Sequence, residues 1–296
     1  MTNTLIRTFS GIAFVAIIVG CLLLGMTTYC IIFAIITAVL LNEFNELLLE
    51  HDIAQVNNTV SIISGVYLFI AFFLTCSGSV GLVAFAPYIL SLLFVLICGL
   101  YNPQTSNFKP QTYWAYTFAG QLYIALPMAL LNVLAFNQIY SPILPLAVFI
   151  FLWLNDTGAY CFGCTLGRKI KFQFSMFNGQ WSITHKLFPS LSPKKTWVGS
   201  IGGAIVVLLG AWAFHAIMVN GQLSMVNGSL LFWLGLGLTV CVFGTWGDLV
   251  ESQLKRTLGI KDSGSFLPGH GGALDRFDSS LLAIPAATAY VLLWGI

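Results

Sequence analysis

The chain has 296 residues, of which 58% are hydrophobic and only 7% are charged. A soluble domain of this size does not need so large an apolar fraction, because a single core stops growing well before that point. The formal net charge of +2 is too small to attract nucleic acid strongly, so no nucleic-acid partner is expected. Apolar runs of about 18 to 25 residues recur from end to end, and each can cross a bilayer as a helix. The sequence therefore predicts an all-α, polytopic membrane protein.

Taken in chain order, the apolar runs predict about nine membrane-spanning helices, and the run after Arg7 is interpreted as an uncleaved first helix. No linker, composition break or repeat divides the chain, so we expect a single integral membrane domain over residues 1–296. Within it, residues 1–140 are expected to hold N-terminal spans and residues 141–296 a catalytic portion. The expected spans are 9–26, 29–49, 59–77, 80–101, 113–136, 142–167, 199–219, 229–250 and 279–296.

The charged residues fall on one side of this topology. All twelve Lys and Arg residues precede the first span or follow the fourth, sixth or eighth. The positive-inside rule makes that side cytoplasmic, which predicts a multi-pass protein of the cell inner (cytoplasmic) membrane with its polar site facing the cytoplasm. A transporter needs access from both sides and places polar groups near the midplane. The one-sided distribution instead favours an enzyme that joins a cytosolic substrate to a membrane-bound one.

The segment 247–256 follows the eighth apolar run directly. If that span continues as a helix, a shared face presents two carboxylates, a hydroxyl and a cation, from Asp248, Glu251, Ser252 and Lys255. A solvated helix end with ordinary ion pairs has the same pattern. Asp248, however, comes directly after an apolar stretch and is expected at the bilayer boundary, where a carboxylate without a function is unfavourable.

Six titratable residues gather between residues 261 and 278. Gly271 and Gly272 predict a tight turn whose backbone amides can approach an anion, with His270 beside it. Asp275 and Asp278 are three residues apart at the start of the last span and share a face if the helix has begun there. Acidic residues in a first helical turn are favourable without any function. Carboxylates beside a glycine turn and flanking cations also describe a site for Mg²⁺ and a phosphate, and a second metal or a monovalent cation is left open.

Two further segments carry polar residues beside apolar spans. Lys194 and Lys195 precede the seventh span and are either a snorkelling pair or a phosphate clamp. Asp156 lies within the sixth span and therefore needs a partner or a polar cavity. Glycines at 158, 163 and 167 favour close helix packing. Gly199 and Gly203 allow a homodimer contact or packing within one chain.

Residues 252–278 closely resemble the signature of the phosphatidate cytidylyltransferase family, the CDP-diacylglycerol synthases, of bacterial type. The run begins Ser252-Gln-Leu-Lys255-Arg256 and ends Gly271-Gly272-Ala-Leu-Asp275-Arg276-Phe-Asp278. Upstream pieces fit as well: Asp156-Thr-Gly-Ala-Tyr160, Ser192-Pro-Lys-Lys-Thr196 and Gly247-Asp248. The resemblance implies transfer of a cytidylyl group from CTP to phosphatidate in the membrane, which yields CDP-diacylglycerol and pyrophosphate for phospholipid biosynthesis.

With that reaction in view, residues can be assigned to roles. The expected main Mg²⁺ ligands are Asp248 and Asp275, with Asp278 and Asp156 as further ligands. The residues expected to hold phosphates or shape their pocket are Lys255, Arg256, Lys261, Arg276 and His270. The other expected substrate-binding residues are Ser192, Lys194, Lys195, Ser252, Asp262, Gly271 and Gly272.

Two other classes of function were weighed. A transporter or flippase of an anionic lipid or phosphate compound predicts flux without chemical change, and the uncharged far side argues against it. A phosphotransferase that consumes CDP-diacylglycerol carries an Asp-Gly…Ala-Arg…Gly…Asp…Asp pattern, which this chain lacks.

Overall fold

A computed structural model describes residues 3–101, 109–137, 139–166, 174–176, 181–183, 186–189, 191–220, 229–260, 262–264 and 271–295. Contacts divide the chain into two compact units. Unit 1 is Met1–Pro145 with Ile260–Phe277, and unit 2 is Leu146–Gly259 with Asp278–Ile296. The signature segment after residue 260 therefore groups with the N-terminal helices.

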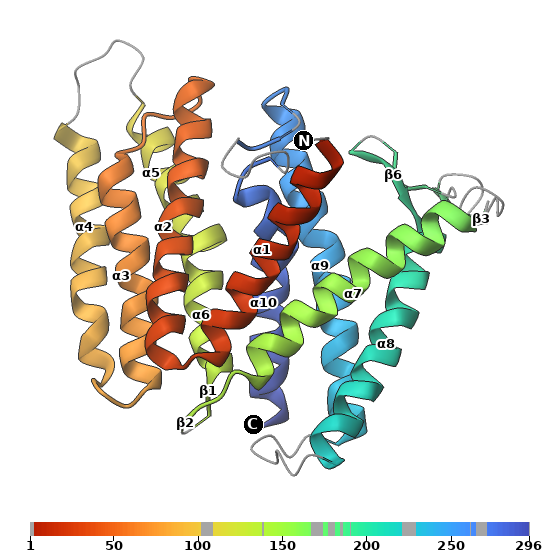
Figure 1. Cartoon of the computed structure of the whole chain (residues 1–296). Coiled ribbons are helices and arrows are strands. Elements are labelled where there is room, and N and C mark those ends of the chain that lie inside the picture. Colours follow the sequence, from red (N-terminus) through yellow and green to blue (C-terminus); the bar gives the residue numbers. More distant parts are fainter. Residues whose placement is uncertain are drawn as a thin grey trace. The chain divides into compact units, whose positions relative to one another are not determined.

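Unit 1 is built from helices that pack against their neighbours in sequence (Figure 1). Helix α2 packs on α1 and α3, and α3 packs on α4 and α6. Tyr29, Phe33 and Phe69 are fully buried among these helices. Its elements are α1 (Asn3–Leu23), α2 (Met26–Glu50), α3 (Asn58–Cys76), η1 (Leu82–Phe85), α4 (Ala86–Tyr101), α5 (Pro110–Gly120), η2 (Gln121–Ala125), α6 (Leu126–Ala135), and the antiparallel strands β1 (Phe136–Asn137) and β2 (Ile139–Tyr140).

Unit 2 holds most of the remaining helices and two short antiparallel hairpins (Figure 1). Helices α8 and α9 pack closely, and Trp233, Phe232 and Phe151 are fully buried. The boundary between the units falls after Pro145 in α7 and after Phe277 in α10. The elements are α7 (Ile143–Thr165), β3 (Phe174–Met176) paired with β4 (Trp181–Ile183), β5 (Lys186–Phe188) paired with β6 (Ser192–Thr196), α8 (Trp197–Asn220), α9 (Leu230–Thr257) and α10 (Leu274–Trp294).

The predicted helical membrane architecture is confirmed. Within the described residues, eight helices are long and apolar enough to cross a membrane, and α1 adds a shorter apolar stretch, Thr8–Leu23. The expected spans coincide with these helices, with ends that differ by up to seven residues, and two of the differing ends lie in the signature. Helix α9 continues past residue 250 to Thr257, and α10 begins at Leu274 rather than at 279. Both extensions place charged residues of the signature on helices.

Local sequence accounts for several helix ends. The side chain of Asn57 accepts a hydrogen bond from Val60 N at 3.2 Å and caps α3, and Ser229 caps α9 in the same way. Pro110 begins α5, where its missing N–H removes no helical hydrogen bond. Pro127 has no N–H for the carbonyl four residues earlier, and the chain forms a π-helix over η2 just before it.

Glycines let α7 and α8 pack closely within unit 2. A Cβ on Gly158 would lie 3.0 Å from the Cα of Gly203, and a Cβ on Gly203 would lie 2.5 Å from Asn155 Oδ1. A Cβ on Gly199 would lie 2.9 Å from the carbonyl oxygen of Ala159. The Gly199 and Gly203 pair thus packs within one chain, which was one of the two alternatives. The homodimer stays a prediction.

This packing gives the first test. Gly203→Ala should lower stability by about 1–3 kcal/mol, because the new methyl overpacks against Asn155. Gly20→Ala is the matched control in a helix, since a Cβ there would meet nothing within 4 Å. The midpoint of thermal unfolding in detergent should fall for Gly203→Ala and hold or rise for Gly20→Ala. Equal midpoints for the two variants would contradict the close packing.

Candidate active site

A cavity of about 200 Å³ lies in unit 2, against helix α7, strand β6 and the start of α8. Asp156 contributes to its lining and is exposed, and its predicted role as a metal ligand stays a prediction. Lys194 and Lys195 reach the cavity from β6. The rest of the lining is Asn155, Ala159, Tyr160, Gly163, Thr196, Gly199, Ser200 and Thr245.

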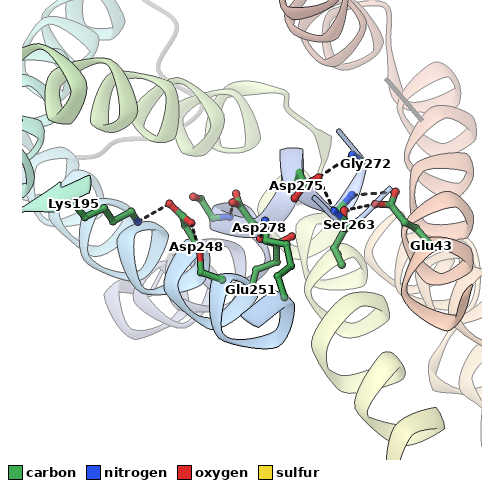
Figure 2. A network of polar contacts seen from close by, with 12 residues as sticks. Glu43, Lys195, Asp248, Glu251, Ser263, Gly272, Asp275 and Asp278 are labelled. Carbon is green, nitrogen blue, oxygen red and sulfur yellow. Dashed lines mark hydrogen bonds and ion pairs between the residues drawn. The ribbon is translucent and has the colours of Figure 1, made fainter. Parts of the chain in front are cut away.

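Asp248 is paired with Lys195 at this site, as Figure 2 shows. Lys195 Nζ lies 2.5 Å from Asp248 Oδ2 and donates to the carbonyl oxygen of Thr245 at 3.3 Å. On the other side, the hydroxyl of Ser252 donates to Asp248 Oδ1 at 3.2 Å. The predicted continuation of the eighth span is therefore confirmed, and it brings Asp248 and Ser252 together on one face of α9.

Gly247 explains how a second carboxylate comes close to Asp248. A Cβ on Gly247 would lie 2.6 Å from the carbonyl oxygen of Asp278, so only glycine lets α9 and α10 approach so closely here. Asp278 Oδ1 accepts a hydrogen bond from Ser279 N at 2.5 Å. The backbone of Asp278 on α10 thus lies beside the residue that precedes Asp248 on α9, while Asp156 on α7 lines the cavity that Lys195 also lines.

The donor chemistry of these carboxylates fits a divalent cation. Mg²⁺ prefers oxygen ligands and is commonly held by one or two carboxylates together with substrate phosphate and water. The lysine at Asp248 shows that this carboxylate attracts positive charge. Over the described ranges no three or more His, Cys, Asp or Glu side chains are grouped so that they could hold a metal ion by themselves. The predicted Mg²⁺ site stays a prediction.

Lys255 has a structural partner. Its Nζ lies 2.5 Å from Glu251 Oε2 on the preceding turn of α9. The side chain of Lys255 is only 12% exposed and that of Glu251 is 0% exposed. Sequence reasoning placed both on the face of Asp248 and assigned Lys255 to phosphates. The structure gives it the additional task of neutralising a fully buried carboxylate, and its phosphate contact stays a prediction.

Asp275, in unit 1, binds the backbone of its own signature segment. Its Oδ2 accepts hydrogen bonds from Gly272 N at 2.8 Å and from Ser263 N at 2.9 Å. Gly271 has φ +82°, and a Cβ there would lie 2.5 Å from the same oxygen, so glycine is required for both reasons. The amide of Gly272 is thus bound to a carboxylate of the protein itself. A phosphate role for this turn stays a prediction.

Glu43 was missed as a site residue. It lies inside α2 near its C-terminal end, is 7% exposed, and reaches the signature segment (Figure 2). Its carboxylate accepts hydrogen bonds from the Ser263 hydroxyl and from Ala273 N, the latter at 2.6 Å. The signal in the sequence was an acidic residue between two asparagines within an apolar run, Asn42-Glu43-Phe44-Asn45.

The other predicted residues keep their roles as predictions. Ser192 begins β6 opposite Phe188, and Arg256 and Arg276 are exposed. Asp262 lines a second cavity, of about 490 Å³, in unit 1, and the carboxylates of Glu43, Glu46 and Glu50 share that lining. The predicted substrate contact of Asp262 stays a prediction. Lys261 and His270 lie outside the described residues.

Asp248 and Asp275 belong to different units, and their predicted convergence on one cation stays a prediction. What the structure does bring together is Asp248 with Lys195 and Ser252 in unit 2, and Asp275 with Ser263 and Gly272 in unit 1.

Comparison with known proteins identifies the family of the chain. A sequence model of the cytidylyltransferase family matches residues 5–294. Proteins named phosphatidate cytidylyltransferase from Staphylococcus aureus (strain COL), Staphylococcus haemolyticus (strain JCSC1435) and Staphylococcus epidermidis (strain ATCC 35984) are 42%, 44% and 40% identical over 142 residues. The aligned stretch covers 47% of this chain and 45% of each relative, so it spans less than half of their length. The family match covers almost the whole chain, and the chain belongs to the cytidylyltransferase family.

The buried pair on α9 gives the second test. Lys255→Met leaves the charge of Glu251 buried without its lysine, so the free energy of unfolding should fall by about 3–5 kcal/mol. The double variant Glu251→Gln with Lys255→Met removes both charges and should recover most of that loss. Denaturant titration in detergent measures both variants. If the double variant is no more stable than Lys255→Met, the lost stability does not come from the unpaired charge of Glu251.

Proposed function

We propose that the protein is a phosphatidate cytidylyltransferase, which converts CTP and phosphatidate into CDP-diacylglycerol and pyrophosphate. Membership of the cytidylyltransferase family and the names of the Staphylococcus relatives support this proposal. The observation that carries it is the pairing of Lys195 with Asp248 beside a cavity that also receives Asp156 and Lys194. Cations and carboxylates at one cavity are what a reaction between two phosphates requires, because phosphates need cations and the metal needs carboxylates.

The reaction is an in-line displacement at phosphorus. A non-bridging oxygen of the phosphatidate phosphate forms a bond to the α-phosphorus of CTP. The bond from that phosphorus to the oxygen that bridges to the β-phosphate breaks, and its electrons leave with pyrophosphate. The nucleophile is already an anion, so a general base is not needed. The barrier arises mainly from repulsion between the two phosphates and from charge on the leaving group.

The residues of the unit 2 cavity suit that task. Lys194 and Lys195 project from β6, and the ammonium groups can bind the triphosphate or the lipid phosphate. Asp248 and Asp278 would hold Mg²⁺, with Asp156 in the lining of the cavity that Lys195 also lines. When bound, Mg²⁺ supplies positive charge to the phosphate oxygens. Lys195 keeps the Asp248 carboxylate oriented through its second contact, to the carbonyl oxygen of Thr245.

Two further parts of the proposal concern location. We propose that the protein lies in the cell inner membrane and that its site faces the cytoplasm, since every Lys and Arg falls on one side of the expected topology. CTP would then arrive from the cytosol, and phosphatidate would stay in the leaflet with its phosphate at the head-group level. Formation of a homodimer is a further part of the proposal.

The third test concerns Asp248. Asp248→Asn keeps the size of the side chain but removes the charge that binds Lys195, so turnover should fall by at least about 10²-fold while the protein still inserts and folds. Asp52→Asn makes the same chemical change on an exposed residue with φ +52°, a conformation that Asn tolerates, and should have normal activity. The assay follows release of pyrophosphate and a labelled lipid from labelled CTP and phosphatidate. Normal turnover by Asp248→Asn would remove this residue from the site.

The fourth test concerns the metal. Chelation with EDTA should abolish turnover of the purified protein, and added Mg²⁺ should restore it, because the proposed carboxylate ligands and the substrate phosphates are mutually repulsive without a bridging cation. Turnover that persists through chelation would exclude the metal from the proposal. The thermal midpoint in EDTA serves as the control for loss of folding.

A further inference from the structure

A buried carboxylate from the N-terminal half of the chain holds the signature segment. Glu43 is only 7% exposed within α2, and within the described residues no lysine or arginine forms an ion pair with it. Burying a charge is costly unless hydrogen bonds replace water. Here the replacement comes from Ser263, Ala273 and Leu274.

The contacts divide between the two carboxylate oxygens. Oε1 accepts from the hydroxyl of Ser263, and Oε2 accepts from Ala273 N at 2.6 Å and Leu274 N at 3.4 Å. Hydrogen bonds to an ionised acceptor are about twice as strong as neutral ones. The two backbone donors stand at the start of α10, where unpaired N–H groups favour negative charge. Glu43 therefore fixes both the beginning of α10 and the residue at 263.

Glycines fit the segment around this carboxylate. A Cβ on Gly272 would collide with Glu43 Oε1, and a Cβ on Gly264 would lie 3.1 Å from the same atom. No side chain can be added at 272 unless Glu43 moves. The glycine requirement at 272 is thus explained by a residue more than two hundred positions earlier in the chain.

Ser263 and Gly272 connect Glu43 to Asp275. The hydroxyl of Ser263 binds Glu43 while its N–H binds Asp275 Oδ2 at 2.9 Å. Gly272 packs against Glu43 and donates its N–H to the same oxygen of Asp275 at 2.8 Å. Two carboxylates thus hold one segment from opposite sides, and a displacement of Glu43 changes the surroundings of Asp275.

We propose that Glu43 is a positioning residue of the cytidylyl transfer: its carboxylate sets the conformation of residues 263–264 and 272–274 and through them the place of Asp275. Glu43 acts through the segment and does not touch the reacting phosphates. The inference rests on the proposed function for its catalytic part. Its structural part, the ordering of the segment by Glu43, can be measured without substrate or metal.

The test compares Glu43→Gln with Glu46→Gln. Gln has the same shape as Glu but carries no charge. Its amide oxygen can accept from Ala273 N and Leu274 N, and its NH₂ can donate to the Ser263 hydroxyl, so the variant replaces hydrogen bonds to a carboxylate by neutral ones, which are about half as strong. Glu46 lies on the next turn of α2, is exposed and lines the same cavity, so it is the matched control. Hydrogen–deuterium exchange in EDTA, without substrate, should be faster by at least about tenfold at Ala273 and Leu274 in Glu43→Gln and unchanged in Glu46→Gln.

Activity gives the second readout. At an unchanged thermal midpoint, Glu43→Gln should lose about 10–100-fold in kcat, as expected for a residue that supports a ligand or catalytic group, and the Mg²⁺ concentration for half-maximal rate should rise. Ser263→Ala removes one hydrogen bond to Glu43 and should shift exchange and rate in the same direction by a smaller factor. If Glu43→Gln does not fold, Ser263→Ala serves as the test.

The outcomes separate this inference from the proposed function. An inactive wild-type protein would overturn the proposed function, and exchange would still report whether Glu43 orders the segment. An active wild type with Glu43→Gln equal to Glu46→Gln in rate, or with unchanged exchange at residues 273–274, would overturn the role of Glu43 and leave the proposed function standing.

Discussion

Every ionised side chain beside a bilayer must find a counter-charge, hydrogen-bond donors or water, because hydrocarbon supplies none of them. This constraint organises the polar parts of the protein. Asp248 is satisfied by Lys195, and the fully buried Glu251 by Lys255. Glu43 is satisfied by backbone amides and a hydroxyl of the signature segment. These contacts satisfy the buried charges. Because several of them join residues that are far apart in the sequence, they also fix the positions of those residues.

Glycines allow neighbouring elements to approach closely enough for these contacts to form. Gly247 lets α10 come near α9 beside Asp248, and Gly203 brings α8 against α7 beside the cavity of Asp156. Gly272 leaves room for Glu43. In each case a methyl group would meet a backbone or carboxylate oxygen of another element. The glycines near the polar site are therefore part of how its charged residues are brought to their places.

The two units hold different parts of the proposed site. Unit 2 carries the cavity with its lysines and the pairing of Lys195 with Asp248, where we propose that phosphates and a cation bind. Unit 1 carries a segment whose amides are already bound by Glu43 and Asp275. The glycine turn of the signature thus bonds to the protein's own carboxylates, and the cations that can receive substrate phosphates lie on β6.

The sequence alone determined the class and the approximate spans, because apolar length is a property of the chain itself. From the placement of scarce charges it proposed most of the charged residues of the candidate site. It also predicted that α9 would continue far enough to place Asp248 and Ser252 on one face. It did not find Glu43, because the donors that satisfy this carboxylate are Ser263, Ala273 and Leu274, and no local pattern encodes such distant partners. Likewise, only the tertiary structure assigned Lys255 to Glu251 and Lys195 to Asp248, since a flexible cation has several carboxylates within reach along the chain and packing selects one.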